Sequence, residues 1–384
     1  MSLDFKDIIL LFQKDNFNEA IQVLNQHYDE NKNNFLFYFY HGIANFKLNK
    51  FDEAKKDFNY GLAINKNIPE IYYNLAVLYY TIGENENAID NFLKTLKINN
   101  KFIDAFIGLT NSLTHTKNYE GNNSEIIGIH KKLNKISFDY SPDKIIKKEN
   151  IKTYLKKINE IINSKFYDFN FNITQTYRRN KPPLICDRHK KIFNEFDAIP
   201  KFCFSCYKVQ IEINNVIDLI KLYLLFDSIE IPNIRKCMIE MRSNILGKYK
   251  GLILCSSIEE SKIIKTQVEE ILNKNIEKFK CKIKRGCTEY GFKYSNYDDL
   301  SVKAMKYNAE WKKFEDLVDK KNPNLSFEKK NKPTIKGMTL YDSLIIRNWL
   351  AYARLIGDKT YEEITDQTFV SKSIEKTLKK NNRI

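Results

Sequence analysis

The chain lacks several features that would place it in a familiar class. Its 384 residues contain no run of eighteen apolar residues, so the sequence offers no membrane-spanning helix. The first residues, MSLDFKDIILLFQKDNF, have no basic leading region and no small-residue cleavage site, so we expect no signal peptide. We therefore expect a soluble, cytoplasmic protein with no membrane partner.

Cysteine is absent from the first 185 residues, and all seven cysteines lie from Cys186 onward. An odd number without a secretion signal favours free thiols or metal ligands over disulfides. Basic and acidic residues are also unevenly distributed along the chain. Residues 1–140 hold 15 Lys and Arg against 17 Asp and Glu, and the remaining residues hold 48 against 31. Two different kinds of domain are therefore joined.

Familiar catalytic motifs are also missing. The sequence has no phosphate-binding P-loop, no GxGxxG, no HExxH and no GxSxG. Cys287 lies beside Arg285 and Glu289, and a nearby arginine would favour its thiolate, but no histidine follows His189 to act as its base. We expect binding rather than catalysis. An enzyme of unrecognised family, with its active site in residues 207–300, is the alternative.

A 34-residue period is present in the acidic half of the chain. Residues 35–68 align with residues 69–102, so that small residues recur where two helices must approach closely and large ones recur where helices interlock. The aligned pairs are Tyr38 and Tyr72, Gly42 and Ala76, Ala44 and Leu78, Phe46 and Tyr80, Phe51 and Asn85, Ala54 and Ala88, Phe58 and Phe92, and Leu62 and Leu96.

This pattern resembles the tetratricopeptide (TPR) repeat family, which implies antiparallel helix pairs stacked into a solenoid. A poorer repeat precedes the two good ones, with Phe17, Glu19 and Ala20 in register, and an irregular unit follows, with a helix expected near residues 124–135. Degenerate end units are typical of repeat arrays because they cap the stack. A generic helical bundle is the alternative interpretation.

In the TPR family the first helix of each pair lines a groove that holds a protein segment. By that resemblance, six residues line the groove here: Phe39, Ile43, Phe46, Tyr73, Val77 and Tyr80. An aromatic and aliphatic groove should prefer an apolar or amphipathic protein segment. The alternative is that these side chains pack against the C-terminal half of the same chain.

A possible metal site follows the repeats. Cys186 and His189 are separated by two residues, and so are Cys203 and Cys206. Two such pairs can present four ligands to a tetrahedral ion, which predicts a structural Zn²⁺. Ordinary buried thiols beside a histidine, or an iron–sulfur cluster, are the alternatives.

Basic residues surround this segment, interleaved with aromatic ones. Such a surface could grip phosphates and stack bases, so nucleic acid or a ribonucleoprotein is a candidate partner. The candidate contacts are Arg178, Arg179, Lys181, Arg188, Lys190 and Lys191.

Beyond residue 206 the pattern indicates an α+β fold. Strands are predicted at 207–213, 236–242 and 249–255, helices at 214–226 and 258–273, and a long strand or hairpin at 279–294. This order is the ferredoxin-like β-α-β-β-α-β arrangement. An RNA-recognition motif shares it, but the stretch matching its third strand, residues 250–255, lacks the aromatics that stack on bases.

The sequence thus predicts an α+β multidomain protein that acts as an adaptor. Its segments are repeats at 1–140, a helical connector at 141–175, the zinc segment at 176–206, the ferredoxin-like domain at 207–317, a linker at 318–337 and C-terminal helices at 338–384, ending in a frayed basic tail. The repeats would bind a protein segment and present the basic module to a second partner.

Overall fold

The computed structural model describes residues 3–136, 138, 144–162, 171–301 and 303–383. The chain forms two compact units. The first consists of Met1–Ser112, Pro182–Lys201 and Lys306–Lys330, and the second of Leu113–Lys181, Phe202–Met305 and Asn331–Ile384. Both units are discontinuous in sequence, a feature that the division into consecutive segments did not contain.

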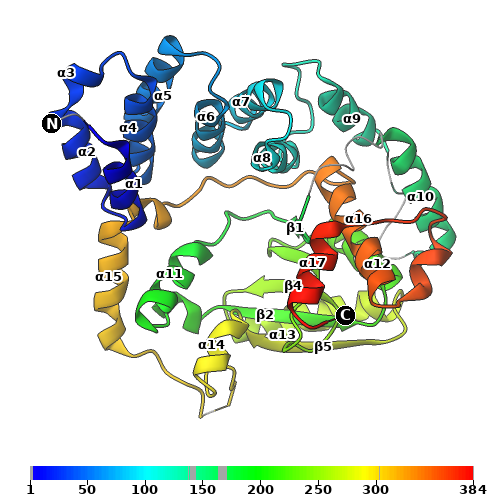
Figure 1. Cartoon of the computed structure of the whole chain (residues 1–384). Helices are drawn as coiled ribbons and strands as arrows, with labels where there is room; N and C mark the ends of the chain where they lie inside the picture. Colours follow the sequence, from blue (N-terminus) through cyan, green and yellow to red (C-terminus); the bar gives the residue numbers. More distant parts are fainter. Residues whose placement is uncertain (1–2, 137, 139–143, 163–170, 302, 384) are drawn as a thin grey trace. The chain divides into compact units, whose positions relative to one another are not determined.

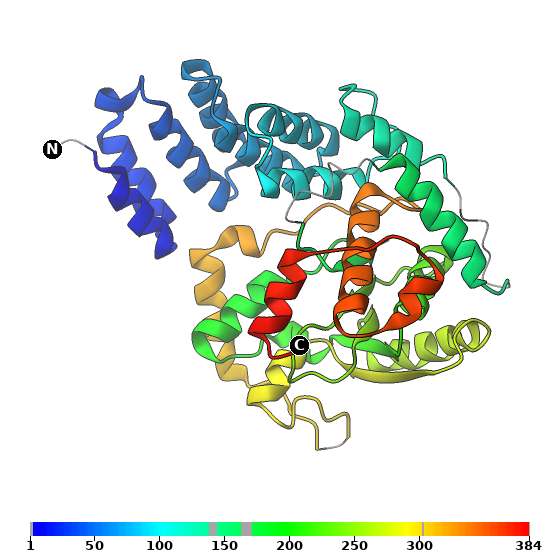
Figure 2. The same ribbon diagram turned by 45° about the vertical axis from the view of Figure 1, so that its right-hand side comes forward.

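Helical hairpins make up most of the first unit. The helices are α1 (Phe5–Gln13), α2 (Phe17–Gln26), α3 (Tyr28–Asn31), α4 (Phe35–Lys47), α5 (Phe51–Ile64), α6 (Pro69–Ile82), α7 (Asn85–Ile98) and α8 (Ile103–Leu113). The pairs α4 with α5 and α6 with α7 pack along their lengths. Figures 1 and 2 show these helices following one another side by side. The helical repeat architecture is therefore confirmed.

Small residues at recurring positions let the repeat helices approach closely. A Cβ atom added to Gly42 would lie 2.7 Å from the Phe58 ring, and one added to Gly108 would lie 2.4 Å from the Phe92 ring. Pro69 is the first residue of α6, a position at which the backbone nitrogen needs no intrahelical hydrogen bond. Gly83 ends the helix with φ +92°. The 34-residue period therefore reflects close contacts between helices.

Two later segments complete the first unit. They form α11 (Cys186–Phe196), the 3-10 turns η3 (Ala309–Trp311) and η4 (Pro323–Leu325), and α15 (Lys312–Lys321). The rings of Phe196 and Phe314 stack at 4.8 Å, and Ile192, Ala198 and Val318 are buried between α11 and α15. The prediction of a linker from residue 318 was wrong at its start, because Val318 anchors the last turns of a helix.

A five-stranded sheet lies at the centre of the second unit. Its strands are β1 (Gln175–Arg178), β2 (Tyr207–Ile213), β3 (Arg235–Ile239), β4 (Tyr249–Cys255) and β5 (Phe279–Arg285), in the spatial order β1-β3-β4-β2-β5. All neighbouring pairs are antiparallel. The predicted α+β character is confirmed. The prediction of a strand or hairpin over 279–294 was wrong, since β5 ends at Arg285 and a short helix, α14 (Thr288–Lys293), follows.

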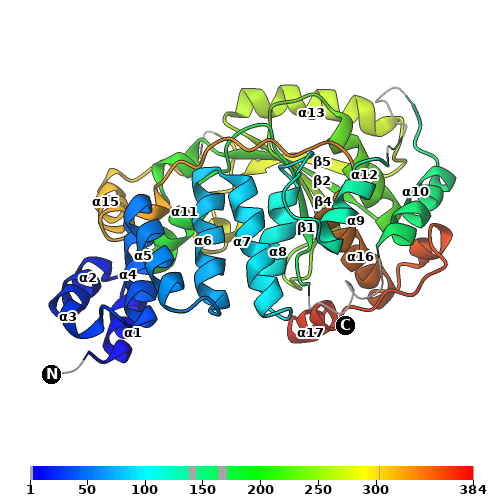
Figure 3. The same cartoon turned by 90° about the horizontal axis from the view of Figure 1, so that it is seen from above.

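Three helices cover one face of the sheet: α12 (Val216–Ser228), α13 (Ile258–Asn273) and α16 (Leu340–Leu355). Figure 3 shows α13 and α12 lying along the strands. The period-two residues Val209, Ile211 and Ile213 are buried beneath them. Asn215 and Ser257 cap α12 and α13 by accepting from the backbone N–H groups of Asp218 and Glu260.

The second unit also contains α9 (Glu125–Leu133), α10 (Lys148–Ile161), η5 (Lys359–Glu363) and α17 (Lys372–Lys380). The tail predicted to fray is instead helical, because Ile374 and Leu378 are buried one turn apart. Residues 141–143 and 163–170 of the predicted connector lie outside the described residues. Within the described part of the chain, none of the helices is long and apolar enough to span a bilayer.

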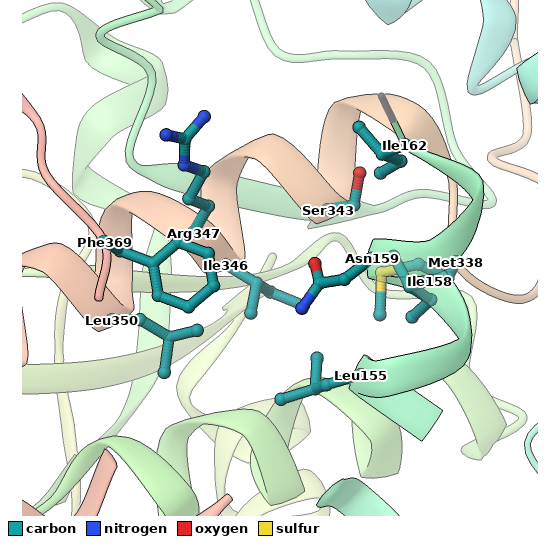
Figure 4. A pocket seen from close by; sticks show the side chains of 10 residues that line it. All are labelled: Leu155, Ile158, Asn159, Ile162, Met338, Ser343, Ile346, Arg347, Leu350 and Phe369. Carbon is teal, nitrogen blue, oxygen red and sulfur yellow. The ribbon is translucent and has the colours of Figure 1, made fainter. Parts of the chain in front are cut away.

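A small pocket lies between α10 and α16 (Figure 4). Its empty volume is about 320 Å³, part of it open to solvent, and its wall is mostly aliphatic. Its three polar lining residues are Asn159, Ser343 and Arg347, and the Arg347 guanidinium lies 5.8 Å from the centre of the Phe369 ring. The pocket contains no residue that the sequence singled out.

Candidate functional site

The six predicted groove residues lie on two parallel repeat helices. Phe39, Ile43 and Phe46 lie on α4, and Tyr73, Val77 and Tyr80 lie on α6. Their spacing of four and then three residues places each set on one helix face. All six side chains are half-buried, so that part of each is exposed and part is held by neighbours.

Contacts with α7, Phe102 and α8 fix the α6 part of this face. The Tyr73 ring stacks on Phe102 at 5.0 Å and tilts against Phe92 at 6.0 Å. Burial raises the pKa of Tyr73, so its hydroxyl stays neutral at physiological pH. The Asn111 side-chain amide donates to the Tyr80 hydroxyl oxygen at 3.2 Å. We call the six residues the repeat face.

A positive charge lies at one end of the repeat face. Lys47 follows Phe46 on α4, and burial lowers the pKa of its amine while Asp15 opposes that shift. Asp15 itself pairs with Lys191 of α11 at 2.6 Å. The face is therefore aromatic and aliphatic, and Lys47 lies at the C-terminal end of α4.

The chain's own segment after α15 lies beside the repeat face. The Phe327 ring meets the Phe51 ring edge-on at 5.0 Å, and Phe51 in turn contacts Phe46 at 5.9 Å. The turn η4 packs against α4. Phe51, which is not one of the six predicted groove residues, therefore packs against a later part of the chain.

Cys186 and His189 lie on α11, in the first unit. Both residues lie at the start of this regular helix, which the burial of Arg188, His189 and Ile192 stabilises against α15. His189 is 2% exposed, and burial together with the adjacent Arg188 lowers its pKa to about 4. The imidazole is therefore neutral at pH 7.

Cys203 and Cys206 belong to the second unit, where they meet Cys287. The Cys203 thiol hydrogen-bonds to Cys287 and also to the Tyr290 hydroxyl at 3.8 Å. The Gly286 N–H donates to the Cys206 carbonyl at 2.9 Å, and the Cys206 sulfur lies where a Cβ of residue 286 would be. We call Cys203, Cys206 and Cys287 the thiol cluster.

Within the thiol cluster, the pKa values of Cys203 and Cys287 shift in opposite directions. The hydrogen bond from Cys203, helped by nearby Lys208, lowers the pKa of Cys287 to about 7, against the opposing effect of burial. The same hydrogen bond and burial raise the pKa of Cys203. The Lys208 amine donates to the Gly286 carbonyl and to the Thr288 hydroxyl, and burial lowers its pKa to about 8. A thiolate beside a neutral thiol is the arrangement used in thiol–disulfide chemistry.

The structure thus brings together only part of the predicted zinc set. Cys203 and Cys206 lie close to each other, whereas Cys186 and His189 belong to the other compact unit. Among the residues that the structure describes, no three His, Cys, Asp or Glu side chains are placed to hold a metal ion. Sequence spacing alone did not point to Cys287, which lies 81 residues after Cys206 in the chain.

Intramolecular ion pairs use much of the predicted basic surface. Arg178 is 4% exposed and contacts Asp227 and Asp342. Arg188 pairs with Asp319 at 2.6 Å and with Glu315 at 3.1 Å, and Lys191 pairs with Asp15 and Glu195. Lys181 and Lys190 remain exposed. The half-buried Arg179 stacks on Tyr177 at 5.5 Å.

The sheet face opposite α12, α13 and α16 carries lysines that sequence analysis did not single out. Lys208 pairs across the strands with Lys284, and their neighbours on the same face include Lys236 and Lys282. Carboxylates offset this charge, since Lys282 lies 2.6 Å from Glu212, and Lys250 lies 3.1 Å from Glu240. The signal was present, because polar residues alternate with apolar ones in YKVQIEI and lysines do so in FKCKIKR.

Several solved structures are similar to part of this chain. One is the crystal structure of MamA, with 25% identity over 28% of this chain and 63% of that chain and a TM-score of 0.27. Another is the first TPR of Spaghetti (RPAP3) bound to an HSP90 peptide, with 20% identity over 28% of this chain and 85% of that one and a TM-score of 0.27. The C-terminal part of a TPR repeat-containing protein from Cytophaga hutchinsonii has 15% identity, coverage of 41% and 59%, and a TM-score of 0.28.

These likenesses are partial, and this chain spans about 63% of the MamA chain. No curated protein matches the sequence. One family model does match, described as tetratricopeptide repeat, over residues 69–102. Those residues are the second of the two well-formed repeats, α6 and α7, whose small and aromatic positions produce the observed contacts. Residues 69–102 are a tetratricopeptide repeat.

Proposed function

We propose that this protein is an adaptor whose repeat face binds a segment of another protein. The observation that carries the proposal is the repeat face itself, six half-buried aromatic and aliphatic side chains on α4 and α6. Such a face gains free energy when an apolar or amphipathic segment removes the rest of its surface from water. The second unit, a basic and ferredoxin-like module, would be presented to another partner.

A charge placed on the repeat face tests this proposal. We expect Val77→Glu to reduce capture of the partner by the full-length protein at least about tenfold, because an unpaired carboxylate in an apolar contact costs more than about 1.4 kcal/mol. Lys97→Glu is the matched control, since it adds the same side chain at an exposed position of α7. Partners are identified by cross-linking and mass spectrometry in cell extract. Equal recovery with both variants would contradict the proposal.

A zinc ion bound by Cys186, His189, Cys203 and Cys206 is the second part of the proposal. Paired cysteine and histidine spacing supports it, and the proximity of Cys203 to Cys206 provides half of the site. Cys186 and His189 belong to the first compact unit, and Cys203 and Cys206 to the second. A closed shell of four protein ligands is structural rather than catalytic.

Metal analysis distinguishes the ligand sets. We expect about one zinc per chain for a four-ligand site, lost in Cys186→Ser and in Cys203→Ser but kept in Cys287→Ser. Inductively coupled plasma mass spectrometry of the purified full-length proteins measures the zinc content per chain. Zinc lost in Cys287→Ser and kept in Cys186→Ser would move the site to the thiol cluster. Absence of stoichiometric zinc in the wild-type protein would reject the ion.

Nucleic-acid binding and catalysis remain predictions. Phosphate contacts would depend on the exposed Lys181 and Lys190, because Arg178, Arg188 and Lys191 already pair with carboxylates. An active site within residues 207–300 would include Cys287, the member of the thiol cluster that lies in this range.

A further inference from the structure

The segment that follows α15 is held in place before it reaches the repeat helices. Asn322 is 4% exposed, and its N–H donates to the Val318 carbonyl at 2.8 Å. The turn η4 comes next, closed by the Leu325 N–H donating to the Asn322 carbonyl at 3.0 Å. The Ser326 hydroxyl then donates to Asp319. These bonds fix the direction in which Phe327 leaves the turn.

Asp319, which holds this turn through Ser326, is itself bonded to another helix of the first unit. Asp319, which accepts from Ser326, also accepts from the Arg188 guanidinium of α11 at 2.6 and 2.7 Å. Through Lys191, α11 pairs with Asp15 at the turn between α1 and α2. Phe327 is therefore positioned by a chain of contacts that starts in the repeat array.

From this turn the chain follows the ends of the repeat helices. Phe327 lies on Phe51 at the start of α5, and the Lys330 side chain lies over Gly83 at the end of α6. A Cβ atom at Gly83 would approach within 3.0 Å of the Lys330 Cδ atom. Three extended residues span at most about 10 Å, close to the separation of packed helices. The segment therefore contacts consecutive repeats in order.

We infer that the surface around Phe51 takes a segment that carries an aromatic residue, and that Asn322–Lys330 of this chain occupies it as a built-in competitor. The inference rests on the proposed function and adds the chemistry of the partner. A partner segment would carry an aromatic residue that replaces Phe327 on Phe51. It would bind only when residues 322–330 leave.

The tether favours the internal segment over a free one. A sequence attached to the same chain acts at an effective concentration in the millimolar range, so a micromolar partner competes poorly unless it binds more tightly or the segment is weakened. Binding to this surface is therefore regulated by how firmly the chain's own segment is held. Phe327 is the residue to remove, because it makes the ring contact and is half-buried.

The test uses a fluorescein-labelled peptide of residues 321–333 and full-length proteins, with fluorescence anisotropy as the measurement. We expect the Phe327→Ala protein to bind the peptide about tenfold or more tightly than the wild-type protein. Phe292→Ala is the matched control, the same change at an exposed phenylalanine of the second unit, and should bind as the wild type does. Phe51→Ala combined with Phe327→Ala should lose the gain, and so should a peptide with alanine at position 327.

Equal binding by wild type and Phe327→Ala, or no binding by either, would overturn the inference. Equal binding of the alanine peptide would overturn the requirement for an aromatic residue in the partner segment. If Phe327→Ala lowers the melting temperature, Phe327→Leu is used in place of that variant, because it removes the ring with a smaller loss of volume. The proposed function fails separately, since it requires capture of another protein to depend on Val77, whatever the peptide does.

Discussion

Replacing Arg178 by methionine should destabilise the second unit by about 3–5 kcal/mol, because it strands a buried carboxylate. The guanidinium reaches Asp227 at 2.5 Å, Asp342 at 3.2 Å and the Gly337 carbonyl at 2.9 Å. Asp342 is 1% exposed, and burial raises its pKa while Arg178 lowers it. Without the arginine, Asp342 must either stay charged in an apolar core or take up a proton. Urea denaturation at pH 7 measures the loss.

The fluorescence of Trp349 reports on this unit. Of the two tryptophans, Trp311 belongs to the first unit and Trp349 to the second, so the measurement is made in a Trp311→Phe background. Lys181→Ala is the control, a nearby cation that is exposed, and should change the free energy of unfolding by less than about 0.5 kcal/mol. A loss below about 1 kcal/mol for Arg178→Met would show that the network contributes little.

Truncating Phe92 should be nearly as damaging to the repeats. Its side chain is 2% exposed and fills the space over Gly108, in contact with Tyr73 of the repeat face. We expect Phe92→Ala to cost about 3–5 kcal/mol, since removal of a buried ring loses its transfer free energy and leaves a cavity. Tyr73 would lose one of its two ring contacts, so we also expect weaker partner binding.

Hydrogen exchange followed by mass spectrometry localises the effect. Amides of α6, α7 and α8 should exchange faster in Phe92→Ala, while those of β2 and β4 should keep their protection. Ile98→Ala is the control on the same helix, because Ile98 is 40% exposed and should cost less than about 1 kcal/mol. Uniformly faster exchange across both units would show that they unfold together.

Local patterns in the sequence predicted most of the elements. The 34-residue period placed the helix pairs because each repeat makes the same contacts with the next, as at Gly42 and Phe58. Alternation placed β2, whose apolar residues Val209, Ile211 and Ile213 face the covering helices, and a short apolar run placed β4. Predictions failed where the pattern was ambiguous. The strand predicted from the lysine alternation of β5 was extended too far, into α14. The many basic residues of the tail obscured the two buried positions of α17, Ile374 and Leu378.

Long-range partners were out of reach of such patterns. Arg178 looked like a surface cation in the run YRRNK, and its burial depends on Asp342, 164 residues away. Cys287 joins Cys203 because Tyr207 on β2 pairs with Arg285 on β5, a register that spacing in the sequence does not reveal. The Phe51 contact with Phe327 likewise depends on where α15 ends.

The discontinuous make-up of the two units has a consequence for synthesis of the chain. Lys306–Lys330 is part of the first unit, so that unit cannot be completed on the ribosome until most of the chain has been made. The repeat helices emerge early and would wait, with Phe51 and its neighbours uncovered, while the sheet is translated. Domains often fold in order from the N-terminus, and exposed apolar surface is what chaperones bind. In this chain the repeat helices emerge first, yet the unit to which they belong is among the last to complete its fold.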